Sequence, residues 1–195
     1  MKKIGITGGI GAGKSLICEV FQLLGTPNYP ADSRAKWLQS NDPELKAKIA
    51  FHFGKEAYFD NGELNREYLS KEVFGNDDKL ELLNRLVHPA VADDFKNWCS
   101  SHANKPYILK EAALLFETGS YKQLDATINV HASHEIRLKR TLERDPQRTP
   151  ESVEAIMKKQ LSDDERLELA DYVIFNDESR SVIKQVIDLH HLLTK

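Results

Sequence analysis

The sequence predicts an α/β fold in which a parallel sheet is flanked by helices. A short β-prone run at residues 3–7 leads through a glycine-rich loop into a helical pattern that Gly25 closes. Further apolar, β-prone runs lie at residues 106–109, 125–130 and 171–175, and helical patterns separate them. Strands that alternate with helices favour parallel pairing, because each crossover helix packs back onto the sheet.

The rest of the chain is predicted to be mostly helical. Residues 26–31 are proline-rich and form at best a short buried strand. Residues 32–101 follow a helical pattern with predicted breaks at 42–43, 53–54, 60–62 and 88–89, and a last helix follows residue 181. We therefore expect three parts, which are a core (1–31, 102–131 and 169–195), a helical subdomain (32–101) and a lid region (132–168).

The composition is that of an ordinary globular protein. Of its 195 residues, 41% are hydrophobic and 29% are charged, which disfavours disorder. No apolar run approaches the roughly 20 residues that a spanning helix needs, and no signal peptide is evident. Two cysteines cannot make a disulfide framework, and the net charge of −3 gives no drive toward nucleic acid or membrane. We expect a cytoplasmic protein with small-molecule partners, and the sequence leaves its oligomeric state open.

The glycine-rich loop fits the phosphate-binding pattern G-x-x-x-x-G-K-S of P-loop proteins, since residues 8–15 read Gly-Gly-Ile-Gly-Ala-Gly-Lys-Ser. Backbone N–H groups of such a loop, and the start of the helix after it, bind phosphate oxygens. Lys14 can reach the β- and γ-phosphates, and the Ser15 hydroxyl can ligate Mg²⁺. The expected ATP-binding residues here are Gly9, Ile10, Gly11, Ala12, Gly13, Lys14, Ser15 and Leu16.

The remaining motifs favour a kinase of small metabolites over other P-loop classes. A GTPase should carry N-K-x-D, but residues 104–107 read Asn-Lys-Pro-Tyr. A motor-type ATPase should carry an aspartate after an apolar strand, and the strand at 107–109 leads into Lys110-Glu111 instead. In a small-molecule kinase a helical insertion binds the acceptor and excludes water from the ATP.

Asp32 is the best candidate for a general base. It follows the presumed second strand, and open α/β sheets bind ligands at the carboxyl ends of their strands. There its carboxylate could accept a hydroxyl proton or help to position Mg²⁺. The alternative is an N-cap for the helical run that begins at Ser33, and the sequence leaves both interpretations open.

A basic stripe marks the helical pattern of the lid region. Arg137, Arg140 and Arg144 stand at positions i, i+3 and i+7, so they share one side of a helix. Guanidinium groups suit phosphate oxygens, which is what a lid over ATP requires. The alternative is a solvated surface on which these arginines pair with neighbouring acidic side chains.

Taken in order along the chain, these motifs resemble the dephospho-CoA kinase family. The resemblance rests on residues 7–15, 31–32, 53–54, 60–66, 73–74, 88–89, 114–117, 140–145, 160 and 170–176. It implies that ATP-Mg²⁺ phosphorylates the ribose 3′-hydroxyl of dephospho-CoA, the last step of coenzyme A synthesis. It further implies catalytic roles for Asp32, Lys14 and Arg140, ATP contacts for Arg144 and Asn176, and an acceptor side that includes Asp32, Arg66, His88, Leu114, Phe116 and Glu117.

Several positions depart from the family's usual pattern without removing the base at Asp32. They are Pro30 for Asp, Leu16 for Thr, Lys36 for Arg, Ala113 for Pro and Asp177 for Gly. Two other functions stay open at this point. One is a different small-molecule kinase, such as a nucleotide kinase, and the other is a nucleotide-sensing module without catalytic activity.

Overall fold

The chain folds into two compact units, each with its own hydrophobic core. The computed structural model describes residues 1–195. The first unit combines residues 1–30 with residues 102–195, and the second comprises Ala31–Ser101. No helix is both long enough and apolar enough to cross a membrane.

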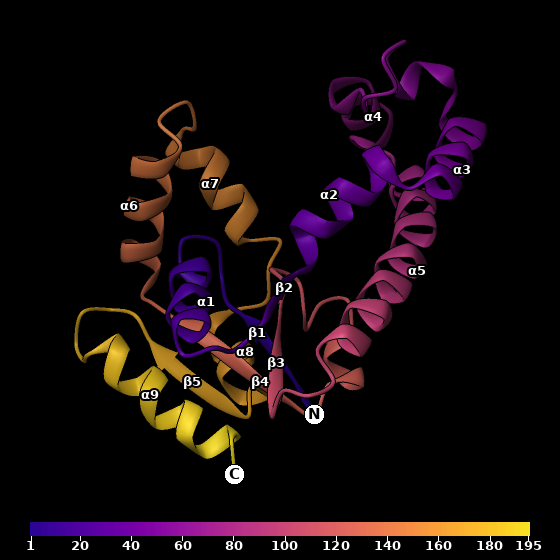
Figure 1. Cartoon of the computed structure of the whole chain (residues 1–195). Helices are drawn as coiled ribbons and strands as arrows, with labels where there is room; N and C mark the ends of the chain where they lie inside the picture. Colours follow the sequence, from indigo (N-terminus) through magenta and orange to yellow (C-terminus); the bar gives the residue numbers. More distant parts are fainter. The chain divides into compact units, whose positions relative to one another are not determined.

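The first unit is built on a five-stranded sheet whose strands are all parallel, which confirms the predicted fold class (Figure 1). Its spatial order is β2-β3-β1-β4-β5. The strands are β1 (Lys2–Thr7), β2 (Asn28–Pro30), β3 (Tyr107–Glu111), β4 (Ala126–His131) and β5 (Tyr172–Phe175). Because the strands run the same way, their carboxyl ends meet at one edge of the sheet, and the glycine-rich loop begins there.

Side chains alternate along each strand and so point to both faces of the sheet, and both faces are covered by other elements. Helices α1 (Lys14–Leu23) and α9 (Val182–Leu193) share a buried cluster with Ile4 and Ile6 of β1. On the opposite face, a side chain at Gly5 would lie 2.6 Å from the Leu115 side chain. The segment between β3 and β4 therefore covers the second face, and the Leu115 side chain occupies the space beside Gly5.

Three helices and a short 3₁₀ turn complete this unit. They are α6 (His134–Arg144), α7 (Pro150–Met157), α8 (Asp163–Leu169) and the turn η2 (Ser120–Gln123). Each helix is capped by a residue whose hydroxyl oxygen accepts a backbone N–H of the first turn. The capping residues are Ser133 for α6, Thr149 for α7 and Ser162 for α8. Such caps satisfy donors that the first helical turn leaves over. These helices occupy the predicted lid region, whose role as a lid stays a prediction.

The second unit is helical throughout. It contains α2 (Ala31–Asn41), α3 (Pro43–Phe53), α4 (Arg66–Val73), α5 (Asp77–Ser101) and a 3₁₀ turn, η1 (Lys55–Ala57). The predicted breaks at 42–43, 53–54 and 60–62 are all present. Asp42 caps α3 by accepting the N–H of Leu45, and Pro43 occupies the first helical position, where proline is favoured.

The predicted break at His88-Pro89 is wrong, because α5 runs through it without interruption. Proline removes one backbone hydrogen bond from a helix interior and crowds the preceding turn. Here the helix is anchored on both sides of Pro89 by buried side chains, Val87 before it and Phe95 and Cys99 after it. Packing of these side chains outweighs the local preference of proline.

Candidate active site

The loop between β1 and α1 has the backbone that the phosphate-binding pattern requires. Gly11 and Gly13 adopt left-handed φ values of 78° and 90°. A side chain on Gly11 would collide with the Arg137 carbonyl oxygen, and one on Gly13 would collide with Nδ2 of Asn176. Glycine is therefore required at both positions for backbone conformation and for space.

Lys14 lies across this loop. Its Nζ donates to the Gly8 carbonyl oxygen at 2.9 Å and is 3.5 Å from that of Gly9. No side chain caps the start of α1 at Gly13. A helix N-terminus next to a fixed ammonium group forms an anion site, and a phosphate chain suits it.

The Ser15 hydroxyl has a carboxylate partner that sequence analysis missed. Ser15 Oγ donates to Glu111 Oε1 at 3.4 Å, and Glu111 ends β3 at the carboxyl edge of the sheet. Hydroxyl and carboxylate oxygens are the hard donors that Mg²⁺ prefers, so the pair fits this ion. The sequence did contain a signal for this role, because Glu111 is an acidic residue at the end of an apolar strand. A motor-type ATPase carries an aspartate at the corresponding place.

The loop after β5 is joined to both the phosphate loop and α6. Asn176 is buried, and its Nδ2 donates to the Ala12 carbonyl oxygen at 2.8 Å. Arg140 Nη1 donates to the Asn176 carbonyl oxygen at 2.8 Å, and its Nη2 lies 3.6 Å from Glu178. Asn176 therefore positions the backbone of the phosphate loop in this structure.

The three arginines of the predicted basic stripe do not share one environment. Arg144 is exposed and pairs with Asp145 at 2.9 Å, as the alternative of a solvated surface expects. Arg137 is buried against the phosphate loop, so the three arginines lie on one side of α6 but differ in their exposure to solvent. Helical spacing gives the angular position of a side chain, but neighbouring elements decide whether it meets solvent.

Gln160, which has no predicted role, holds the phosphate loop through its side chain. Its Oε1 accepts the N–H of Ile10 at 2.9 Å. The next residue, Leu161, donates its N–H to Glu117 Oε1 at 3.1 Å, and Glu117 Oε2 is buried without a hydrogen-bond partner. No local pattern indicates the contact between Ile10 and Gln160, because 150 residues separate them.

The other acceptor-side candidates lie in different surroundings. Leu114 is 44% exposed, whereas Phe116 is buried and meets the ring of Tyr121 edge to face. In the helical unit, Arg66 begins α4 and His88 lies within α5, and both are exposed. The structure gives Leu114, Arg66 and His88 accessible side chains and encloses Phe116.

Asp32 lies in the first turn of α2, and its side chain is exposed. The helix begins at Ala31, so Asp32 is inside the helix rather than the residue that caps it. A carboxylate there interacts favourably with the positive end of the helix dipole. The N-cap interpretation therefore does not describe this residue.

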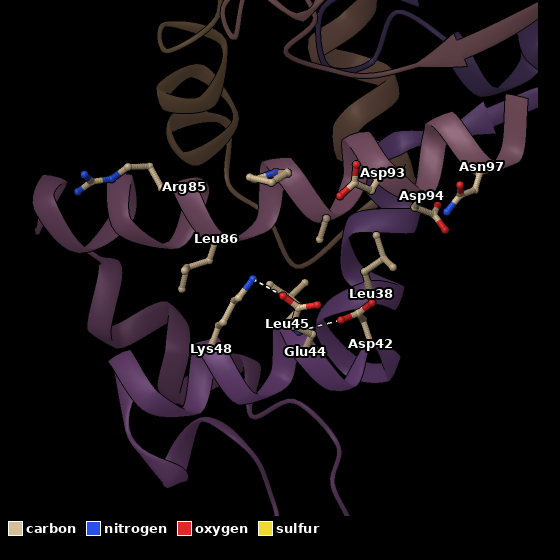
Figure 2. Close-up of a pocket in the computed structure, with 12 residues that line it drawn as sticks. Leu38, Asp42, Glu44, Leu45, Lys48, Arg85, Leu86, Asp93, Asp94 and Asn97 are labelled. Atoms are coloured by element: carbon tan, nitrogen blue, oxygen red, sulfur yellow. Dashed lines mark hydrogen bonds and ion pairs between the residues drawn. The ribbon is translucent and has the colours of Figure 1, made fainter.

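The helical unit contains a hollow of about 410 Å³ between α2, α3 and α5 (Figure 2). Its lining combines apolar side chains such as Leu38 and Leu45 with a polar rim, where Lys48 pairs with Glu44 at 2.6 Å. The lining carries the carboxylates of Asp42, Glu44, Asp93 and Asp94 but only two cationic groups, those of Lys48 and Arg85. Asp94 is paired with Arg34 at 2.6 Å, which leaves three carboxylates against the two cations. The remaining excess of negative charge disfavours a phosphate group, and none of the predicted acceptor residues of this unit, Asp32, Arg66 and His88, lines the hollow.

Comparison with known proteins agrees with this arrangement. The sequence profile described as dephospho-CoA kinase matches residues 2–181. The chain is 33% identical to dephospho-CoA kinase from Bacteroides fragilis over 187 residues, which cover 96% of this chain and 90% of that one. It is 38% identical to dephospho-CoA kinase from Salinibacter ruber over 179 residues, with coverage of 91% and 89%.

Solved structures share the fold over the whole chain. TT1252 from Thermus thermophilus superposes with a TM-score of 0.85 at 28% identity, covering 98% of this chain and 96% of that chain. Dephospho-CoA kinase from Campylobacter jejuni, at 24% identity and a TM-score of 0.73, has the same fold with the same coverage. With its phosphate loop, parallel sheet and family profile, the chain belongs to the dephospho-CoA kinase family and is an ATP-using P-loop kinase.

Proposed function

We propose that this protein transfers the terminal phosphoryl group of ATP to the ribose 3′-hydroxyl of dephospho-CoA, giving coenzyme A and ADP. Dephospho-CoA kinase activity is the final step of coenzyme A biosynthesis. The observation that carries the proposal is the family match over residues 2–181, which contain an intact phosphate loop with Lys14 across it. These substrates, together with the composition of the chain, favour the cytoplasm as its location.

The loop supplies the ATP side of the reaction. Backbone N–H groups of residues 9–16, other than the Ile10 N–H that donates to Gln160, bind the phosphates together with the start of α1, and the Lys14 ammonium group moves from the Gly8 carbonyl to the β- and γ-phosphates. Asn176 and Gln160 hold the loop backbone from two sides, so its donors are oriented before the substrate arrives. Such preorganised charge stabilises the oxygens of the phosphoryl group during transfer.

Ser15 and Glu111 would hold Mg²⁺. The hydroxyl would ligate the ion, and the carboxylate would bind it directly or through a water molecule. When bound, the ion neutralises charge on the β- and γ-phosphates.

The helical unit supplies the base. The exposed carboxylate of Asp32 accepts the proton of the acceptor hydroxyl, or directs it, as the hydroxyl attacks the terminal phosphorus. Arg140 and Arg144 are proposed to offset charge from the lid region. Leu114, Glu117, Arg66, His88 and the enclosed Phe116 remain the proposed acceptor-side residues. The diphosphate of dephospho-CoA is expected outside the carboxylate-rich hollow.

An acceptor-dependence assay tests the function. ADP release from ATP-Mg²⁺ is measured with dephospho-CoA, with nucleoside monophosphates and with no acceptor, and the product is identified by mass. We expect release only with dephospho-CoA, and a product heavier by one phosphoryl group. Release with a monophosphate would indicate a nucleotide kinase, and binding of ATP without transfer to any acceptor would indicate a sensing module.

Paired lysine variants connect the activity to the phosphate loop. Lys14→Ala should lower both ATP affinity and turnover, whereas Lys184→Ala, on the surface of α9, should leave both unchanged. An unchanged ATP titration in Lys14→Ala would exclude the phosphate contact of this side chain.

A further inference from the structure

Two buried guanidinium groups lie directly against Gly9 of the phosphate loop. Arg137 of α6 is 4% exposed and Arg166 of α8 is 3% exposed. A side chain on Gly9 would collide with Nη1 of Arg137 and lie 3.1 Å from Nη2 of Arg166. Gly9 does not adopt a left-handed φ, so the need for glycine here arises from the two guanidinium groups.

This cluster carries excess positive charge. Arg137 Nη2 lies 2.8 Å from one Asp163 oxygen, and Arg166 Nη2 lies 2.6 Å from the other. Burial favours protonation of Asp163, but the two guanidinium groups outweigh it and lower its pKa, so the carboxylate is ionised. One carboxylate thus faces two cations, and no second carboxylate lies within 4.0 Å of either guanidinium. A buried charge without a counter-ion is costly, which indicates that an anion completes the cluster.

Arg166 has a donor that is not used within the protein. Its Nη1 is fully buried and has no hydrogen-bond partner. Arg137, by contrast, also donates through Nε to the Ala132 carbonyl oxygen at 3.1 Å. A buried cationic donor left unsatisfied costs more than a neutral one. This observation is independent of the charge balance and assigns the anion to Arg166.

The position of Lys14 in the phosphate loop indicates which anion the two guanidinium groups can reach. Lys14 Nζ, the group that binds β- and γ-phosphates in such loops, lies 2.9 Å from the Gly8 oxygen and 3.5 Å from that of Gly9. The two guanidinium groups therefore adjoin the part of the loop where the end of the triphosphate is expected.

We propose that Arg166 is a further nucleotide-binding residue, which donates from Nη1 to an oxygen of the terminal phosphate of ATP. Asp163 and Arg137 are positioning residues that hold its guanidinium plane against Gly9. This proposal rests on the proposed function, because it assumes that the loop binds ATP. It makes Arg166 a source of selectivity for the triphosphate over the diphosphate, so that ADP leaves more readily than ATP.

The test compares two nucleotides in three proteins. Kd values for Mg²⁺ complexes of ADP and of the β,γ-imido analogue of ATP are measured calorimetrically, without acceptor, for the wild type, Arg166→Met and Arg166→Lys. We expect Arg166→Met to weaken the ATP analogue by about 10-fold or more, as loss of a charged hydrogen bond should. ADP binding should change by less than about threefold, and Arg166→Lys should restore part of the loss because it keeps the charge.

A matched control removes the same charge elsewhere. Arg148→Met, at an exposed arginine that pairs with Asp145, should leave the ratio of the two Kd values unchanged. Equal losses for both nucleotides in Arg166→Met, or no loss at all, would overturn the proposal, since a purely structural role would not distinguish ATP from ADP.

A second variant covers the case in which Arg166→Met does not fold. Gly9→Ala adds one methyl group where the guanidinium groups lie, so it should displace them and reduce affinity for the ATP analogue more than for ADP. An unchanged ratio in Gly9→Ala would also overturn the proposal. If the wild type binds ATP but transfers nothing to dephospho-CoA, the proposed function fails while this ratio stays measurable. If Arg166→Met turns over normally with an unchanged ratio, only the present proposal fails.

Discussion

Asp32 is exposed in the first turn of α2, and the proposed reaction requires its carboxylate to accept or direct a proton. Asp32→Asn keeps the size and polarity of the side chain but removes this capacity. We expect kcat to fall by at least roughly 100-fold, the effect of losing a general base, with ATP affinity nearly intact. Steady-state kinetics with a separate ATP titration checks this.

Asp78→Asn is the matched control for this change. Asp78 is also an exposed aspartate in the first turn of a helix, α5, so the variant changes the same charge against the same kind of helix end. It should keep wild-type kcat. Near-normal turnover in Asp32→Asn would remove Asp32 from the mechanism.

Glu111 is proposed to support Mg²⁺ binding together with Ser15. Its carboxylate accepts from the Ser15 hydroxyl, and the two oxygens together suit Mg²⁺. Glu111→Gln keeps an acceptor oxygen but loses the negative charge. The Mg²⁺ concentration for half-maximal activity should therefore rise by about 10-fold or more, as it does when a partner of a metal ligand is lost. An unchanged Mg²⁺ titration at saturating ATP would show that Glu111 does not support the ion.

At the scale of elements, α9 packs on the sheet through buried side chains, and one of its polar contacts there involves a histidine. His190 Nδ1 lies 2.7 Å from the Tyr107 hydroxyl and 3.4 Å from Thr26 Oγ1. Burial raises the pKa of Tyr107 to about 12, so its hydroxyl stays protonated and donates to neutral His190. Burial, with a smaller contribution from the charge of His191, lowers the pKa of His190 below its usual 6.5.

This pKa shift makes the attachment of α9 sensitive to pH. Because the folded protein favours neutral His190, its contribution to stability is present above about pH 6.5 and is lost as the pH falls through the lowered pKa. His190→Asn keeps an acceptor near Tyr107 but cannot titrate. The free energy of unfolding, measured in urea at pH 7.5 and 5, should fall less in this variant than in the wild type. His191→Asn should lose nearly as much unfolding free energy between pH 7.5 and pH 5 as the wild type. An equally large loss in His190→Asn would show that His190 is not the titrating group.

Some helices, strands and loops can be predicted from local sequence patterns, and others cannot. Four strands were accessible because each is a short β-prone run, whereas β2, with the sequence Asn-Tyr-Pro, was expected only as at best a short buried strand. The phosphate loop was accessible because its spacing is local. Pro89 was misjudged because buried neighbours in α5 override its local preference. Gln160, Glu111 and Arg166 acquire their roles from segments far away in sequence, and only the folded chain brings those contacts together.

For the whole molecule, the two units have separate hydrophobic cores, and the helical unit carries Asp32, Arg66 and His88 of the proposed acceptor side. The nucleotide unit is built around a buried cluster that includes Ile17 and Phe21 of α1, the helix that begins at Lys14. The helical unit is built around another cluster that includes Ile49, and the two clusters share no residue. Damage to one core should therefore affect one substrate more than the other.

Ile49→Ala tests this separation. Ile49 is fully buried in α3, and loss of its side-chain carbons should destabilise the protein by about 2–5 kcal/mol. Because the helical unit carries Asp32, we expect the KM for dephospho-CoA to rise while the Kd for ATP-Mg²⁺ stays within about twofold. Phe21→Leu is the complementary change, since it loosens the packing under α1 and should weaken ATP binding. Urea unfolding measures the loss of stability in each variant, and nucleotide titration measures the loss of ATP affinity. Equal losses of ATP affinity in Ile49→Ala and Phe21→Leu would show that the two cores are energetically coupled.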